Sequence, residues 1–161
     1  MRAVVGAFLL TIGLLTSAHS QELADAQRAF SHGSYVRSAQ MFLREAKQGL
    51  PLAQTFLGYQ YQMGWGVPKS YEEAAYWFGR AAEQGEPSAQ FFLALLFDRG
   101  QGVSENPIEA AKWLDLAAAH APPSRREYWV NMRDNVSSKL TLGELAEARR
   151  RAVAWAPVFE R

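Results

Sequence analysis

Two glycine-rich loops are the first candidates for chemistry in this sequence. Gly64-Trp65-Gly66 and Gly100-Gln101-Gly102 place glycines where a loop could wrap around a phosphate group. Neither loop follows a predicted strand, and both lack the third glycine and the Lys-Ser/Thr pair of nucleotide-binding loops. Because the same loop occurs twice at a fixed spacing, we predict that both are structural turns.

Metal-binding and nucleophilic groups are sparse. His32 and His120 are the only histidines after residue 20, and the chain has no cysteine. Neither histidine belongs to a His-Glu-x-x-His pattern, so we expect no zinc site. Ser138 and Lys139 are adjacent, whereas a Ser-x-x-Lys nucleophile needs them one helical turn apart. We therefore expect no catalytic residue, no metal and no cofactor.

Carboxylates offer a third kind of chemistry, since paired acids can transfer protons. Glu72, Glu73 and Glu83 fall on one predicted helix. Acidic residues on an exposed helix face usually serve solvation or capping. We interpret these three in that way and predict that the chain is not an enzyme.

Charge and composition restrict the class of partner. Seventeen Lys and Arg residues balance 16 Asp and Glu residues, which leaves a formal net charge of +1. A surface that neutralises nucleic-acid phosphates needs a stronger basic excess, so we expect no nucleic-acid partner. With 48% hydrophobic residues the chain can form a folded core.

The N-terminal segment has the pattern of a signal peptide. Arg2 precedes an apolar run over residues 3–15, and the small residues Ala18 and Ser20 occupy the positions that a signal peptidase reads. This pattern predicts cleavage between Ser20 and Gln21 and a periplasmic or secreted protein. The run is shorter than the about 20 residues of a membrane span, so we expect no stable span after cleavage. Retention of the uncut segment as an anchor is the alternative.

An internal repeat of 36 residues organises the rest of the chain. Residues 53–85 align without gaps on residues 89–121, with identical residues at 13 of 33 positions. Residues 39–49 match residues 75–85 at the same offset, so part of an earlier repeat precedes the two complete ones. A repeat of this length indicates stacked supersecondary units that share one core.

Each repeat predicts two helices, because apolar residues recur four apart, as Leu57 and Tyr61 do. Pro51 and Pro87 suit a first helical turn, and a serine or asparagine three residues before a glutamate marks the second helix as a capping box. The predicted helices cover residues 22–31, 35–48, 51–63, 71–84, 87–99, 107–120, 123–139 and 142–155. The fold class is therefore all-α, an α-α hairpin superhelix of about four antiparallel hairpins.

The motifs resemble the Sel1-like repeat, a relative of the tetratricopeptide repeat. The resemblance rests on Leu57-Gly58, the Gly64-Trp65-Gly66-Val67 loop and the run Ala74-Ala75-Tyr76-Trp77-Phe78. A tetratricopeptide repeat has a period of 34, and the two extra residues here fall in the Gly-x-Gly-Val loop. On this basis residues 1–20 are a signal peptide, 21–50 a capping hairpin, 51–85 and 86–121 two repeats, and 122–161 a C-terminal cap.

The resemblance implies a function in binding. Members of this family are typically non-enzymatic adaptors, and exported bacterial members regulate envelope sensors, secretion systems or contacts with host proteins. Some exported members bind or slowly hydrolyse β-lactams, but their hairpins are joined by disulfides, and this chain has no cysteine. We expect a monomeric, exported protein that binds a protein or peptide. Binding or hydrolysis of cell-wall fragments or β-lactams, and a purely structural role in an envelope assembly, are the alternatives.

In such superhelices the first helix of each hairpin lines the concave side. The helical stripe offset from inward-facing Leu57 and Leu93 is the candidate groove, because aromatic and methionine side chains are enriched at binding hot spots. Its residues are Phe56, Tyr59, Gln60, Met63, Phe92, Leu96 and Arg99. Phe56, Phe92 and Leu96 could instead pack against neighbouring helices, whereas we expect Tyr59, Gln60, Met63 and Arg99 to be exposed. A groove about three hairpins wide suits a peptide or one helix of a partner.

Overall fold

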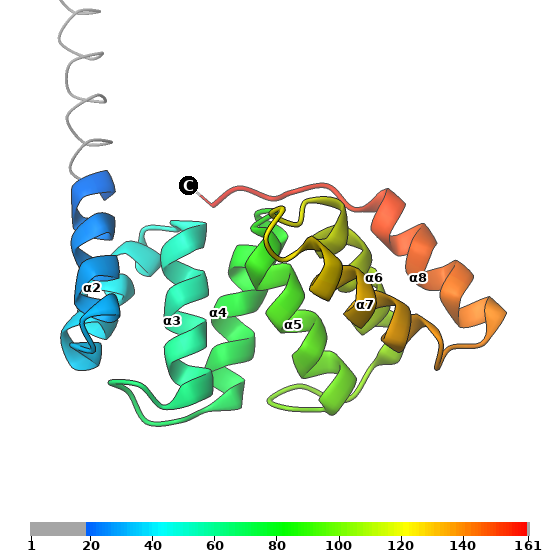
Figure 1. The fold of residues 1–161 in the computed structure, drawn as a ribbon, viewed down its shortest axis with the longest axis horizontal. Coiled ribbons are helices and arrows are strands. Elements are labelled where there is room, and N and C mark those ends of the chain that lie inside the picture. The colour runs from blue at the N-terminus through cyan, green and yellow to red at the C-terminus, as the bar shows by residue number, and fades with distance from the viewer. Residues whose placement is uncertain (1–18, 161) are drawn as a thin grey trace, which may run out of the picture.

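The computed structural model describes residues 19–160, so the predicted signal peptide lies almost entirely outside the described residues. Residues 19–160 form eight helices and no strand (Figure 1). The first helix covers residues 19–31. The others are α2 (Tyr35–Lys47), α3 (Pro51–Met63), α4 (Tyr71–Glu83), α5 (Pro87–Arg99), α6 (Pro107–Ala119), α7 (Arg126–Ser137) and α8 (Leu142–Ala154). The predicted all-α class is confirmed, and none of the described helices is both long and apolar enough to cross a membrane.

Local signals set the helix boundaries. Pro51 and Pro87 open α3 and α5, where a missing backbone N–H costs nothing. Ser70 and Asn106 cap α4 and α6, because their side chains accept hydrogen bonds from backbone N–H groups three residues later. Thr141 forms the full reciprocal capping box that opens α8. The helix α7 is shorter than predicted because residues 122–125 form a turn before it.

The helices pack in chain order along one row (Figure 1). The two repeats are the pairs α3 with α4 and α5 with α6, and α2 packs on α3 as α4 packs on α5. The last pair differs from a repeat, since α7 and α8 each pack on α6. The second helix of the last repeat therefore supports both C-terminal helices.

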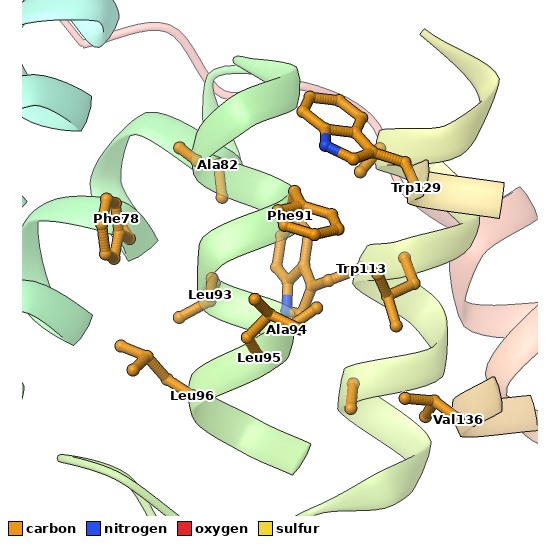
Figure 2. Close-up of a cluster of buried hydrophobic side chains, with 14 of the residues drawn as sticks. Phe78, Ala82, Phe91, Leu93, Ala94, Leu95, Leu96, Trp113, Trp129 and Val136 are labelled. Carbon is orange, nitrogen blue, oxygen red and sulfur yellow. The ribbon is translucent and has the colours of Figure 1, made fainter. Parts of the chain in front are cut away.

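Alanines and large aromatic rings form the core together. Ala74, Ala81 and Ala110 have no exposed surface, which lets neighbouring helices approach closely. Figure 2 shows Phe91 and Trp129 beside one another, and their rings stack with centroids 4.9 Å apart. The cluster of Figure 2 thus joins the second repeat to the C-terminal helices.

The Gly-x-Gly loops are contacts between repeats, which confirms that they are structural turns. Gly66 and Gly102 have φ angles of 76° and 70°, a region that favours glycine. A Cβ on Gly66 would lie 2.2 Å from the carbonyl oxygen of Tyr35, and one on Gly102 would lie 2.1 Å from that of Tyr71. Both tyrosines begin the second helix of the preceding hairpin. Each loop therefore closes on the previous hairpin, at a position that only glycine fits.

After α8 the chain turns back along the row of helices. Residues 155–160, which we call the strap, run from α8 past α6 and α4 toward the start of α3 (Figure 1). The indole N–H of Trp155 donates to the Glu83 side chain at 3.1 Å, and the backbone N–H of Val158 donates to the Glu83 carbonyl at 2.7 Å. Glu160 forms an ion pair with Arg80 of α4. The strap thus holds the C-terminal end of the described chain against the first repeat.

Candidate functional site

A hollow of about 540 Å³ opens on the side of the first helices. We call it the aromatic hollow. It lies between the helix of residues 19–31, α3, α5 and the turn before α7, and its lining residues are Phe30, Leu52, Thr55, Phe56, Tyr59, Trp65, Ser88, Phe92, Pro122 and Arg125. Both repeats and both capping regions therefore contribute to one surface.

Aromatic rings form a connected wall in the hollow. Phe30 contacts Phe56, Tyr59 and Trp65 with centroid separations of 5.4, 6.3 and 5.9 Å. Tyr59 in turn lies 5.6 Å from both Trp65 and Phe92. All five rings are partly exposed. Edge-to-face and tilted arrangements of this kind are favourable, so the rings fix one another's positions while they stay accessible.

Rings of the interior support this wall from behind. Phe56 stacks on buried Phe42 at 4.8 Å, with ring planes only 2° apart. Phe92 stacks on Phe78, which is also fully buried, at 5.2 Å. The wall is therefore anchored in the core, and a ligand would meet a preformed surface, which lowers the entropy cost of binding.

Polar groups lie at one edge of the hollow. Arg125 is exposed there. The Thr55 hydroxyl donates to the Pro51 carbonyl at 2.9 Å and to the Glu86 side chain at 3.1 Å. Glu86 also accepts a bond from the backbone N–H of Ala89, and burial raises the pKa of the Glu86 carboxyl above its ordinary value. An apolar wall with a cation at its rim suits apolar side chains of a peptide with an acidic group nearby.

The structure brings three of the seven predicted groove residues together. Phe56, Tyr59 and Phe92 all line the aromatic hollow. Met63 and Arg99 are exposed at the C-terminal ends of their helices, as expected, but neither is among the lining residues. The exposed residues of the predicted stripe therefore do not form one site, since Met63 and Arg99 lie outside the aromatic hollow.

Two of the predicted groove residues face the interior. Gln60 and Leu96 have no exposed surface, so neither can contact a partner, and the expected exposure of Gln60 was wrong. The Gln60 amide N–H group donates to the Tyr35 carbonyl at 3.1 Å, the Ser38 hydroxyl at 2.8 Å and the Trp65 carbonyl at 3.1 Å. These bonds satisfy the N–H groups of the buried amide, and they tie the loop after α3 to α2.

Sequence reasoning missed two of the five rings of the wall. Phe30 precedes residues 39–121, the part of the chain that matches at the 36-residue offset, so the repeat gave no signal that Phe30 lines a shared surface. Trp65 was assigned only to a turn. Its partner 36 residues later is Gln101, so the repeat gave no signal that an aromatic ring belongs there.

Comparison with known proteins agrees with this geometry. The sequence profile of the family described as Sel1 repeat matches residues 51–86 and 87–121, which are the two helix pairs at the centre of the row. The chain contains two Sel1 repeats. Sel1 repeats commonly mediate protein–protein interactions, and the family is generally a non-catalytic scaffold. No curated protein matches the chain.

Two solved structures share the Sel1-like fold. One is a protective antigen present in uropathogenic Escherichia coli strains and displaying an SLR fold, with 26% identity and a TM-score of 0.78; the match covers 85% of this chain and 29% of that one. The other is a Sel1 repeat protein from Oxalobacter formigenes, with 28% identity and a TM-score of 0.64; it covers 83% of this chain and 55% of that one. This chain spans well under two thirds of the length of either protein.

Proposed function

We propose that this Sel1-like repeat protein binds an extended peptide or a single helix of a partner protein in the aromatic hollow. The observation that carries the proposal is the connected wall of five partly exposed rings, which includes Phe30, Tyr59 and Trp65. Aromatic side chains of this kind dominate the energetics of protein interfaces. The size of the hollow, about 540 Å³, accommodates several side chains of a ligand rather than a whole domain.

A ligand for this hollow has a definite chemistry. Apolar side chains would fill the space between Phe56, Tyr59 and Phe92 and displace water from the rings. An acidic group of the ligand would lie toward Arg125, the cation on the rim. We infer that the preferred ligand combines two or three apolar anchors with a carboxylate at one end.

The test is a peptide selection followed by measured affinities. Peptides of twelve residues selected on the unchanged chain are expected to carry apolar anchors, and the change Tyr59→Ala should weaken their binding about tenfold or more. Tyr76→Ala is the matched control, because Tyr76 is 55% exposed on α4 and lies outside the hollow. Equal affinities for the parent and the Tyr59→Ala variant would rule out the hollow as the binding site.

We further propose that the protein works outside the cytoplasm, as an adaptor or regulator in the cell envelope. The apolar run after Arg2 and the small residues Ala18 and Ser20 support this assignment. Mass spectrometry of the protein from a periplasmic fraction should find an N-terminus at Gln21. A full-length chain confined to the cytoplasmic fraction would contradict export.

A further inference from the structure

The strap contacts a second, separate group of side chains. Glu160 lies in a cluster formed by Gly49, Gln54, Arg80 and Gln84, which we call the carboxylate site. Its residues come from α3, from α4 and from the turns that follow α2 and α4. None of them lines the aromatic hollow.

The carboxylate of Glu160 is bound at both oxygens. Arg80 Nε donates to one oxygen at 2.7 Å, and its terminal Nη2 donates to the other. The Gln54 amide donates to this second oxygen at 3.0 Å. A two-pronged guanidinium bond with a further amide donor is the strong form of carboxylate recognition. This geometry is typical of a specific carboxylate-binding site and differs from that of a single exposed ion pair.

Residues of the first repeat hold the site in place without help from the strap. Gln54 is fully buried, and its amide also donates to the Ala46 carbonyl at 3.2 Å. The Gln84 amide donates to the Gln54 side-chain oxygen at 2.9 Å and to the Arg80 carbonyl at 3.3 Å. These bonds fix the Gln54 and Gln84 amides independently of the strap, which lowers the cost of binding a ligand there.

Glycine provides the space that the bound carboxylate occupies. A Cβ on Gly49 would lie 2.9 Å from the Cβ of Glu160, closer than real Cβ atoms approach. The backbone N–H of Glu160 also donates to Gln84 at 3.4 Å, so the site recognises both main chain and side chain of an acidic residue.

The site occurs once in the two repeats. The residues 36 positions after Arg80 and Gln84 are Leu116 and His120. These side chains cannot replace the Arg80 guanidinium and the Gln84 amide of the first repeat. Of the two repeats, only the first offers a guanidinium at this position, and Glu160 of the strap binds it.

Trp155 at the start of the strap packs on Trp113, but apolar burial contributes little to holding the last residues of the strap. Val158 and Phe159, the two residues before Glu160, are 64% and 70% exposed. Attachment near the end of the strap depends on the Val158 backbone bond and on Glu160. A segment attached by a few polar contacts behaves as a tethered ligand that a competing segment can displace.

We propose that the carboxylate site is a second peptide-binding site, specific for an extended segment with an acidic residue, and that the strap is its intramolecular occupant. An acidic segment of a partner protein binds in the carboxylate site after it displaces the strap. Displacement leaves the aromatic hollow unchanged, so the two sites act on separate ligands or on separate parts of one ligand.

Fluorescence anisotropy with the full chain tests the proposal. The probe is a labelled peptide with the sequence of residues 154–160 and blocked ends. Glu160→Ala weakens the strap as a competitor, so this variant should bind the peptide at least about tenfold more tightly than the parent chain. A peptide with glutamine in place of its final glutamate should bind at least about tenfold more weakly. Equal binding of the two peptides, or no binding to the Glu160→Ala chain, would overturn the proposal.

Variants of the protein locate the binding. In the Glu160→Ala background, Arg80→Ala should abolish peptide binding, while Arg99→Ala, a change of an exposed arginine on α5, should leave it unchanged. Tyr59→Ala should also leave it unchanged, which separates this site from the aromatic hollow. Dimers of the parent chain that dissociate on Glu160→Ala would show that the strap occupies the site of a second copy, which would contradict an intramolecular occupant. Peptide binding that survives Arg80→Ala would contradict it.

Discussion

Replacement of Gly102 by alanine tests how the repeats lock together. The new Cβ would lie 2.1 Å from the carbonyl oxygen of Tyr71, at the first turn of α4. Because that atom belongs to the backbone of a packed helix, the loop after α5 must move away from the preceding hairpin. The change therefore strains the contact between the loop after α5 and the preceding hairpin.

Two effects contribute to the expected loss of stability on Gly102→Ala. A left-handed conformation for a non-glycine residue costs about 1 to 2 kcal/mol. Overpacking against atoms that cannot relax adds about 1 to 3 kcal/mol. Gly102→Ala should therefore lower the free energy of unfolding by about 2 to 5 kcal/mol. At about 2 to 4 °C per kcal/mol for a chain of this size, the Tm should fall by roughly 4 to 20 °C.

Alanine substitutions at two other glycines distinguish the conformational cost from the cost of overpacking. Gly100 has φ of 60°, but the nearest atom to its Cβ would be the Cβ of Glu105 at 3.3 Å, so Gly100→Ala should cost only the conformational part of about 1 to 2 kcal/mol. Gly79 lies inside α4 with nothing within 4 Å of a Cβ, and Gly79→Ala should stabilise the chain by about 0.5 to 1 kcal/mol.

The assay is thermal and urea unfolding of the four chains, followed by circular dichroism at 222 nm. The account predicts the order Gly79→Ala, parent, Gly100→Ala, Gly102→Ala from most to least stable. Equal losses for the changes at Gly100 and Gly102 would refute the claim that the second glycine is held by close approach to the preceding hairpin.

Three further predictions concern the core and two carboxyl groups whose pKa is raised by burial. Trp113 is 3% exposed and packs edge-on against Trp155 at 6.1 Å, so Trp113→Ala should cost about 3 to 5 kcal/mol; a Tm shift of a degree or two would contradict this. Burial raises the pKa of Glu86, so its contribution to stability is present at low pH and is lost as pH rises through the folded-state pKa; Glu86→Gln should therefore lose less Tm between pH 4 and 7 than the parent. Burial, with a contribution from Glu22, likewise raises the pKa of Glu45, and Glu45→Gln should flatten the same pH profile; an unchanged profile would be inconsistent with a buried carboxyl there.

The order and length of the helices could be predicted from the sequence, because they depend on local signals. Ser70 and Thr141 each begin a helix by accepting a backbone N–H three residues later, and Pro51 suits the first turn of α3. The 36-residue repeat then showed that neighbouring units share one core. Prediction was least accurate at α7, where the repeat pattern ends and the turn after Pro122 shortens the helix.

The candidate site could be predicted only in part. The helical period shows which residues share one face of a helix, but it does not show which other segments pack against that face. Phe56, Tyr59 and Phe92 were predicted from their spacing and line the hollow. Gln60 was expected to be exposed as part of the groove stripe, yet it is buried and donates to two groups of α2 and to the Trp65 carbonyl. Trp65 has no aromatic counterpart in the next repeat, where the equivalent residue is Gln101.

The strap could not be predicted at all. Glu160 and Arg80 lie 80 residues apart, and nothing in the residues around Glu160 indicates an acidic side chain that returns to the first repeat. Contacts of this kind depend on the assembled superhelix, along which the segment after α8 runs back past α4 (Figure 1).

The most direct test of the central claim is to map a bound ligand. Amide and aromatic NMR shifts should be recorded for the full chain with a selected twelve-residue peptide. The account predicts that the largest changes concentrate at Phe56, Tyr59, Trp65 and Phe92, with little change at Tyr76 on α4. Changes confined to the α4 and α6 side, with the rings of the aromatic hollow unaffected, would contradict it.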